Sequence, residues 1–180
     1  DGNGKQLKTD NGTECARVLG IDPGTRATGY GLIECSRPIH QLIECGVIRT
    51  RTGDLDQRLL DIHSATLDLI DRHAPTCVAI EGVFAGRNAR TALLLGHARG
   101  VLMLAAALRG LPIHEYAPRE VKKRVVGTGA AGKEQVGFMV KQHLRLATAP
   151  KPADAADGCA IALCHLIAQL PASMGSGVVS

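Results

Sequence analysis

The chain has 180 residues, of which 45 % are hydrophobic, 21 % charged and only 2 % aromatic, and its formal net charge is +4. This composition predicts one globular domain whose core is built from Ala, Leu, Val and Ile rather than from aromatic rings. No stretch approaches a membrane span, because the most apolar segment, residues 91–110, contains His97, Arg99 and Arg109. The first residues also lack the apolar h-region of a signal peptide, so we expect a cytoplasmic protein with no membrane partner.

The six cysteines show neither a CxxC pair nor the Cys/His spacing of a zinc site. Cys77 lies in a strand-like apolar run and Cys159 in a helical one. We therefore expect reduced thiols in the core and no disulfide framework.

The first half of the chain predicts a meander of strands followed by a helix and a further strand. Residues 1–16 lack periodicity and indicate a disordered leader. Three strands are predicted at residues 17–23, 28–35 and 40–50, with a turn after the first. Asp54 and Gln57 resemble a capping box at the start of a helix that runs to about Arg72, and a short buried strand follows at residues 77–81.

The second half predicts mainly helices. Residues 83–87 indicate a loop, and a long apolar helix is expected over residues 88–108, with burial on most sides. A strand is predicted at residues 112–116, and helices at 118–126, 133–144 and 153–169, the last with Pro152 suited to its first position. A flexible tail is expected over residues 171–180, so the domain spans residues 17–170. The pattern predicts an α/β fold, a mixed sheet with helices on its faces.

Two acidic residues follow directly on buried strands. Asp22 ends the apolar run at residues 18–21, and Glu81 ends the run at residues 77–80. An ionised carboxylate beside a buried strand is costly unless it is paired, hydrogen-bonded or metal-bound. Alone, Asp22 could be an Asx-turn residue and Glu81 an ordinary acid at a strand end.

Two further acids, Asp154 and Asp157, are three residues apart at the start of the last helix and therefore project from one face. Alone they could be capping residues, because the helix dipole favours negative charge there. Together with Asp22 and Glu81 they offer the convergent carboxylates that phosphodiester hydrolysis with two Mg²⁺ ions needs.

Five blocks of the sequence resemble the RuvC family of Holliday-junction resolvases. These are IDPGTRATGYGLI (residues 21–33), AIEGVF (79–84), NARTALLLGHARGV (88–101), YAPREVKKRVVGTGAAGKEQV (116–136) and PADAADGCAIA (152–162). The resemblance runs from about Arg17 to Leu166. It implies an RNase H-like fold with a mixed five-stranded sheet and helices on both faces, a homodimer, and paired nicking of four-way DNA junctions. It also implies a branch-migration helicase complex as partner.

The resemblance carries residue roles with it. The catalytic and metal-binding carboxylates fall on Asp22, Glu81, Asp154 and Asp157, with two Mg²⁺ ions per site and Mn²⁺ as a substitute. Phe84 is implied to stack on or wedge bases at the junction, although an aromatic beside a strand end can equally be a core residue. Residues implied or expected to contact DNA are Lys122, Lys133, Arg87 and Arg90. Solvated helix charges are the competing interpretation of these cations. His97 and His165 lie in apolar helical stretches, where core or interface positions are the simpler interpretation.

The charge is unevenly distributed, which bears on the partner. Residues 1–85 carry a net charge of −3 and residues 86–180 carry +7. A basic half favours phosphate-rich partners such as DNA. Two other functions stay open at this point: an actin-like nucleotide phosphotransferase lobe, and a protein that binds junctions without cutting them.

Overall fold

The computed structural model describes residues 17–36, 39–51, 53–82 and 88–169. The predicted leader, the tail and the loop at residues 83–87 lie outside these ranges. The described elements, in chain order, are β1 (Arg17–Asp22), β2 (Ala27–Glu34), β3 (Gln41–Arg49), α1 (Leu55–His73), β4 (Cys77–Glu81), α2 (Ala89–Leu108), β5 (Ile113–Tyr116), α3 (Pro118–Val126), α4 (Lys133–His143) and α5 (Ala153–Ala168). Each predicted strand and helix is present, with ends that differ by one residue or a few.

The five strands form one mixed sheet in the order β3-β2-β1-β4-β5. β1 pairs antiparallel with β2, and β2 with β3, as the predicted meander requires. β4 and β5 then extend the sheet with parallel pairing on the other side of β1. The prediction of an α/β fold with a mixed five-stranded sheet is confirmed.

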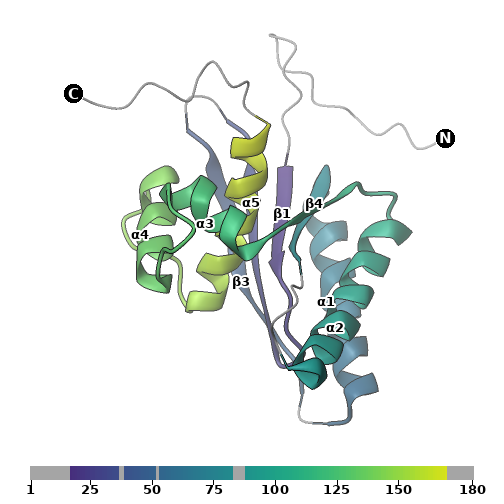
Figure 1. Cartoon of the computed structure of the whole chain (residues 1–180). Coiled ribbons are helices and arrows are strands. Elements are labelled where there is room, and N and C mark those ends of the chain that lie inside the picture. Colours follow the sequence, from purple (N-terminus) through teal and green to yellow (C-terminus); the bar gives the residue numbers. More distant parts are fainter. Residues whose placement is uncertain (1–16, 37–38, 52, 83–87, 170–180) are drawn as a thin grey trace, which may run out of the picture.

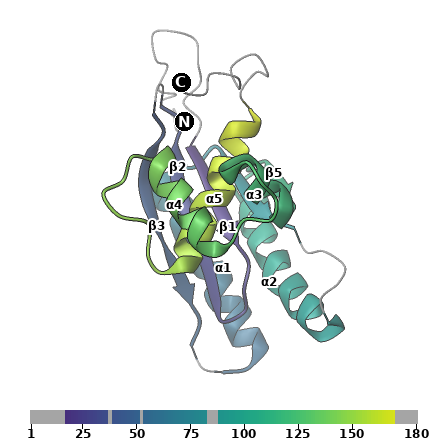
Figure 2. The ribbon, with the colours of Figure 1, turned by 60° about the vertical axis from the view of Figure 1, so that its left-hand side comes forward.

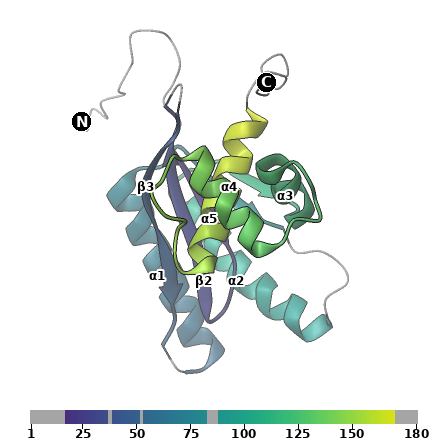
Figure 3. The same cartoon turned by 90° about the vertical axis from the view of Figure 1, so that its left-hand side faces the viewer.

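Helices cover both faces of the sheet (Figure 1). α1 and α2 lie on one face and enclose a core that includes Leu19, Ile80 and Leu102. α3, α4 and α5 lie on the other face, over a second core that includes Val18, Ala79 and Ile161 (Figure 3). Alternate residues of the central strands therefore enter opposite cores, which is why β1 and β4 read as continuous apolar runs.

α5 packs closely on β1 and β2 because glycines line its path (Figure 2). A Cβ at Gly31 would lie 2.5 Å from the Cα of Cys159, and a Cβ at Gly29 would overlap the carbonyl oxygen of Asp154. Any side chain at these two positions would push α5 away from the sheet. This close approach beside Asp22 fixes where α5 begins.

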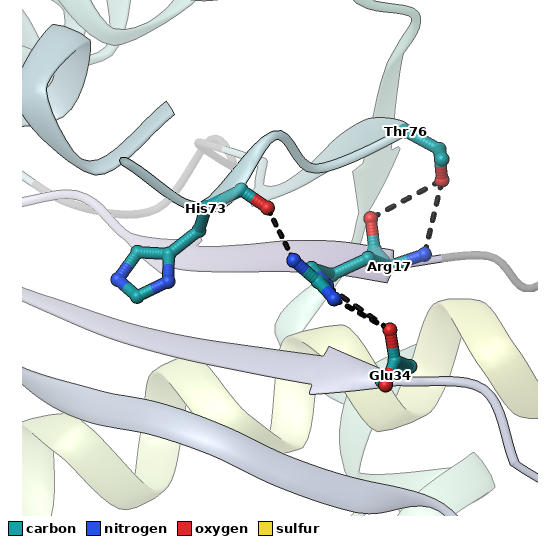
Figure 4. Close-up of polar contacts among 4 residues, drawn as sticks. All are labelled: Arg17, Glu34, His73 and Thr76. Atoms are coloured by element: carbon teal, nitrogen blue, oxygen red, sulfur yellow. Dashed lines mark hydrogen bonds and ion pairs between the residues drawn. The ribbon is translucent and has the colours of Figure 1, made fainter. Parts of the chain in front are cut away.

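Arg17 holds the opposite end of β1 in place (Figure 4). Its guanidinium donates to the carbonyl oxygen of His73 at 2.6 Å and to Oε1 of Glu34 at 2.6 Å. Its backbone N–H donates to Oγ1 of Thr76 at 3.1 Å, and that hydroxyl donates to the carbonyl of Arg17 at 3.2 Å. One residue thus ties β1 to β2, to the end of α1 and to the approach to β4.

The expectation that α2 is buried on most sides is wrong. Its buried residues are Ala98, Leu102, Ala105 and Ala106, whereas Leu93 is 64 % and Leu104 51 % exposed. The expectation that no stretch approaches a membrane span also needs correction, because α2 is long and apolar enough by length and composition to cross one. In this structure α2 instead packs against α1 and, through an Arg99–Glu115 ion pair, is tied to β5.

Two expected helix starts differ in detail. Asp54 occupies the cap position of α1 but makes no capping hydrogen bond through its side chain, so no capping box forms with Gln57. Pro152 lies at the cap of α5, one residue before the helix, rather than at its first helical position. Both helices nevertheless begin close to where the sequence predicts, because the apolar periodicity and not the cap determines the helix.

Candidate active site

Asp22 and Glu81 are brought together by the parallel pairing of β1 and β4. Ile21 lies opposite Ile80 in the sheet, so the next residue of each strand stands at the same edge. The two carboxyl groups lie close enough that Glu81 raises the pKa of Asp22. The sheet therefore places two acids side by side at the end of its central strands.

The turn after Asp22 is closed by Thr28. Its hydroxyl donates to the carbonyl oxygen of Gly24 at 2.7 Å and accepts from the Gly24 N–H at 3.4 Å. Asp22 itself pairs across the sheet with Gly29. The hairpin that carries Asp22 is thus held by buried contacts, because the Thr28 side chain is fully buried.

α5 brings two more acids to the same place. Asp154 and Asp157 lie in its first turns, and α5 begins beside Gly29 because that glycine touches the backbone of Asp154. Carboxylate oxygens of Asp22, Asp154 and Asp157 lie within 4.8 Å of one another. The structure therefore brings all four predicted acids together: three share one cluster, and Glu81 joins it through Asp22. We call these four residues the acidic cluster.

The carboxyl groups of the acidic cluster repel one another. Burial, together with the charges of Glu81 and Asp157, raises the pKa of Asp22 from 3.8 to about 7. Burial also raises the pKa of Asp157, against the opposing effect of Lys133. A cluster in which charge is so unfavourable would be stabilised by a cation placed among its oxygens.

Lys133 lies over the acidic cluster from the first residue of α4. Its Nζ is 3.3 Å from Oδ2 of Asp157, while the lysine side chain remains 72 % exposed. Asp157, and more weakly Asp154 and Asp22, raise the pKa of Lys133. Lys122 on α3 is near enough that its charge lowers the pKa of Asp157. The ion pair between Lys133 and Asp157 was not predicted, because the two residues are 24 positions apart and only the packing of α4 on α5 joins them.

The other predicted DNA-contacting residues are placed less fully. Phe84 and Arg87 lie outside the described residues. Arg90 is exposed in the first turn of α2. His165 is buried and hydrogen-bonded, as expected of a core residue, whereas His97 is exposed on α2 and lines a shallow groove there. The buried free thiols of Cys77 and Cys159 also agree with expectation.

The donors of the acidic cluster suit a hard divalent cation. They are carboxylate oxygens, the ligands that Mg²⁺ and Mn²⁺ prefer, and no soft sulfur or imidazole donor joins them in the described cluster. Asp157 is 23 % exposed, so the cluster opens to solvent and to a substrate. The geometry fits a metal-assisted hydrolytic centre at the surface of the domain.

Comparisons with known proteins show which family the chain is similar to. The family model described as "Crossover junction endodeoxyribonuclease RuvC" matches residues 18–165. The RuvC proteins of Pelotomaculum thermopropionicum and Legionella pneumophila are 48 % and 51 % identical to this chain over 149 residues. These matches cover 82 % of this chain and 91 % and 85 % of the relatives. The structure of RuvC from T. thermophilus in complex with a Holliday junction substrate superposes with a TM-score of 0.80. It is 35 % identical and covers 85 % of this chain and 94 % of that one.

Proposed function

Because the chain belongs to the RuvC family of crossover junction endodeoxyribonucleases, with the RNase H-like fold of its structural relatives, we propose that its acidic cluster is the centre that cuts Holliday junctions. Its function is that of a Holliday junction resolvase. The observation that carries the assignment of the site is the convergence of Asp22, Asp154 and Asp157 within 4.8 Å, with Glu81 close enough to raise the pKa of Asp22. Four acids from three elements meet there.

We propose Mg²⁺ as the cofactor, with two ions per site and Mn²⁺ as a substitute. The ligands would be Asp22, Glu81, Asp154 and Asp157, since their oxygens fit a hard cation and their mutual repulsion is relieved by one. Bound Mg²⁺ supplies activation of a water molecule and neutralisation of the leaving oxygen. Because the pKa of Asp22 is raised to about 7, a proton held there must leave before this carboxylate can act as a ligand.

Lys133 is well placed to serve the substrate. Its ammonium is mostly exposed and yet stands beside Asp157, so a phosphate held at the acidic cluster would lie within its reach. Lys122 adds positive charge on the neighbouring helix. We propose that both lysines help to hold the junction backbone, and that Arg90 contacts it farther out. The proposed role of Phe84 rests on the family resemblance, and that of Arg87 rests on its positive charge in the sequence.

We propose a homodimer formed through the outer face of α2, defined by Leu93, Gly96, Gly100, Leu104 and Leu108. The three leucines are exposed, and the two glycines between them allow another surface to approach closely. A contiguous apolar surface of this kind marks an interaction site in a soluble protein. A symmetric dimer would present two acidic clusters, one for each strand to be cut.

The proposed dimer can be tested with one charge. Leu104→Glu is expected to yield a monomer in light scattering after gel filtration, because a buried unpaired carboxylate opposes association. The matched control is Leu60→Glu on α1, where the leucine is similarly exposed but does not line the α2 groove. If Leu104→Glu stays dimeric, or if both variants dissociate equally, the assignment of this face is wrong.

The remaining proposals about partners rest on the family. The +7 charge of residues 86–180 supports binding of four-way DNA. The branch-migration helicase complex as partner and the cytoplasmic location stay predictions. The actin-like phosphotransferase is not favoured, because relatives matched over most of their length are endonucleases. A protein that binds junctions without cutting them is disfavoured by the complete set of four acids.

The assigned site is tested by comparing substrates and metals. The wild-type protein is expected to cut a four-way junction in Mg²⁺, to bind it without cutting in Ca²⁺, and to leave linear duplex and RNA–DNA hybrid intact. Asp154→Asn is expected to bind the junction but to lose cleavage by at least about a hundredfold, since a ligand is lost. Asp68→Asn, an exposed acid on α1, is the control. Wild-type cleavage by Asp154→Asn would show that the acidic cluster is not the catalytic centre.

A further inference from the structure

A second group of potential metal ligands lies away from the acidic cluster. Cys77 is the first residue of β4, His114 lies in β5 and His165 is near the end of α5. A sulfur or nitrogen atom of each lies within 4.8 Å of the other two. Cys77 and His165 are buried, with 7 % and 4 % exposure, and His114 is half-buried.

Sheet geometry explains why these three side chains meet. His114 pairs with Ala79 in the β4–β5 ladder, and Cys77 is two residues before Ala79. Residues two apart on a strand share a face, and so do residues paired on neighbouring strands. Cys77 and His114 therefore both point toward the same layer. That layer is the core beneath α5, where His165 is buried. The rings of His114 and His165 are in contact, with centroids 4.3 Å apart.

The distance between Cys77 and His165 is that of two ligands on one tetrahedral ion. Sγ of Cys77 is 3.5 Å from Nε2 of His165. With Zn–S near 2.3 Å and Zn–N near 2.05 Å, tetrahedral angles place the two donor atoms about 3.6 Å apart. A zinc ion therefore fits between them with little movement of either side chain. His114 completes three protein ligands and leaves a fourth position for water.

Tyr116 orients His165 for such a role. Its hydroxyl is 2.8 Å from Nδ1 of His165, the ring nitrogen that faces away from Cys77. When Nδ1 holds the proton and donates it to the tyrosine oxygen, Nε2 presents its lone pair toward Cys77. A hydrogen bond to the second nitrogen is how proteins fix the tautomer of a metal-binding histidine. Burial also keeps His165 neutral, because its pKa is lowered to about 4.

The donors select a different metal from that of the acidic cluster. One thiolate and two imidazoles suit Zn²⁺ and bind Mg²⁺ poorly. The group also lies at the opposite end of β4 from Glu81, four residues or about 13 Å away along the strand. It therefore cannot share ligands with the acidic cluster.

We propose that Cys77, His114 and His165 form a Zn²⁺ site that joins β4, β5 and α5, with Tyr116 as the positioning residue. Binding releases the thiol proton of Cys77 to solvent, and the ion then ties α5 to the hydrogen-bonded pair of strands β4 and β5. The site stabilises the end of the sheet remote from catalysis, so it is not required for metal-dependent cleavage itself.

Titration of the full-length protein with Zn²⁺ in excess Mg²⁺, which occupies the acidic cluster, tests the proposal. One zinc ion per chain is expected, together with a rise in Tm. Co²⁺ is expected to give a thiolate charge-transfer band and the intense visible bands of a tetrahedral ion. Cys77→Ser and His114→Gln are each expected to weaken zinc binding at least about a hundredfold, and Tyr116→Phe about ten- to a hundredfold.

Cys164→Ala is the matched control, because this buried thiol precedes His165 on the same helix but lies outside the group. It is expected to keep full zinc binding and the cobalt bands. His114→Gln provides the second test should Cys77→Ser fold poorly, since His114 is only half-buried. The proposal is overturned if the wild-type protein binds no zinc in excess Mg²⁺. It is equally overturned if the zinc that binds is lost in Asp157→Asn but retained in His114→Gln.

Discussion

Repulsion within the acidic cluster should lower the stability of the metal-free protein. The variant Asp22→Asn measures how much stability the ionised Asp22 costs. In the folded protein the pKa of Asp22 is raised from 3.8 to about 7 by burial, Glu81 and Asp157. Each pKa unit corresponds to about 1.4 kcal/mol, so the ionised carboxylate costs the folded state up to about 4 kcal/mol. Asparagine has nearly the same shape and carries no charge.

The sign of the pH dependence follows from the direction of the shift. Below pH 3.8 the carboxyl is protonated in both states and costs nothing. As the pH rises toward 7, the unfolded chain ionises Asp22 while the folded protein resists, so stability is progressively lost. At pH 7.5 in EDTA, the free energy of unfolding of Asp22→Asn is expected to exceed that of wild type by about 2–4 kcal/mol. This difference should shrink to below about 1 kcal/mol at pH 4.

Urea unfolding followed by circular dichroism measures both values, and Tm should rise by about 5–12 °C at pH 7.5. Mg²⁺ is expected to stabilise wild type but not Asp22→Asn, which should also lose junction cleavage. Asp68→Asn, an exposed acid on α1, should change stability by no more than about 0.5 kcal/mol. An Asp22→Asn protein that is no more stable than wild type at pH 7.5, or whose advantage is the same at pH 4, would refute the reasoning.

Two further predictions concern the surroundings of the acidic cluster. Gly31→Ala places a methyl group 2.5 Å from the Cα of Cys159, so it should displace α5, cost about 1–3 kcal/mol of stability and slow cleavage. Gly137→Ala in α4 meets no atom closer than the Cβ of Ala149, at 4.0 Å, and should stabilise α4 by up to about 1 kcal/mol. Equal urea midpoints for the two variants would contradict this account. Lys133→Met removes the cation that lowers the pKa of Asp157, so the pH–rate profile in Mg²⁺ should move to higher pH, whereas Lys133→Arg should keep it. If the pH–rate profile of Lys133→Met equals that of wild type, Lys133 does not influence catalysis through the pKa of Asp157.

Local patterns in the sequence were enough to predict the strands, the helices and the four acids. β4 matches its predicted range at both ends, because a short apolar run bounded by Pro75 and Glu81 has few other ways to fold. Asp22 and Glu81 stood out because each follows a buried strand. Helix α2 was misjudged, since an apolar composition does not tell which face meets the core and which meets a second surface. Only the packing against α1 decides that.

What the sequence by itself determined is the order of strands and helices and the acids that end them, because both depend on neighbouring residues. The tertiary structure alone decided which distant residues meet. Lys133 meets Asp157 because α4 packs on α5, and Cys77 meets His165 because a helix near the end of the chain crosses the start of β4. Neither pair can be recognised from a spacing in the sequence, because long-range contacts depend on how the layers pack and not on the number of residues between the partners.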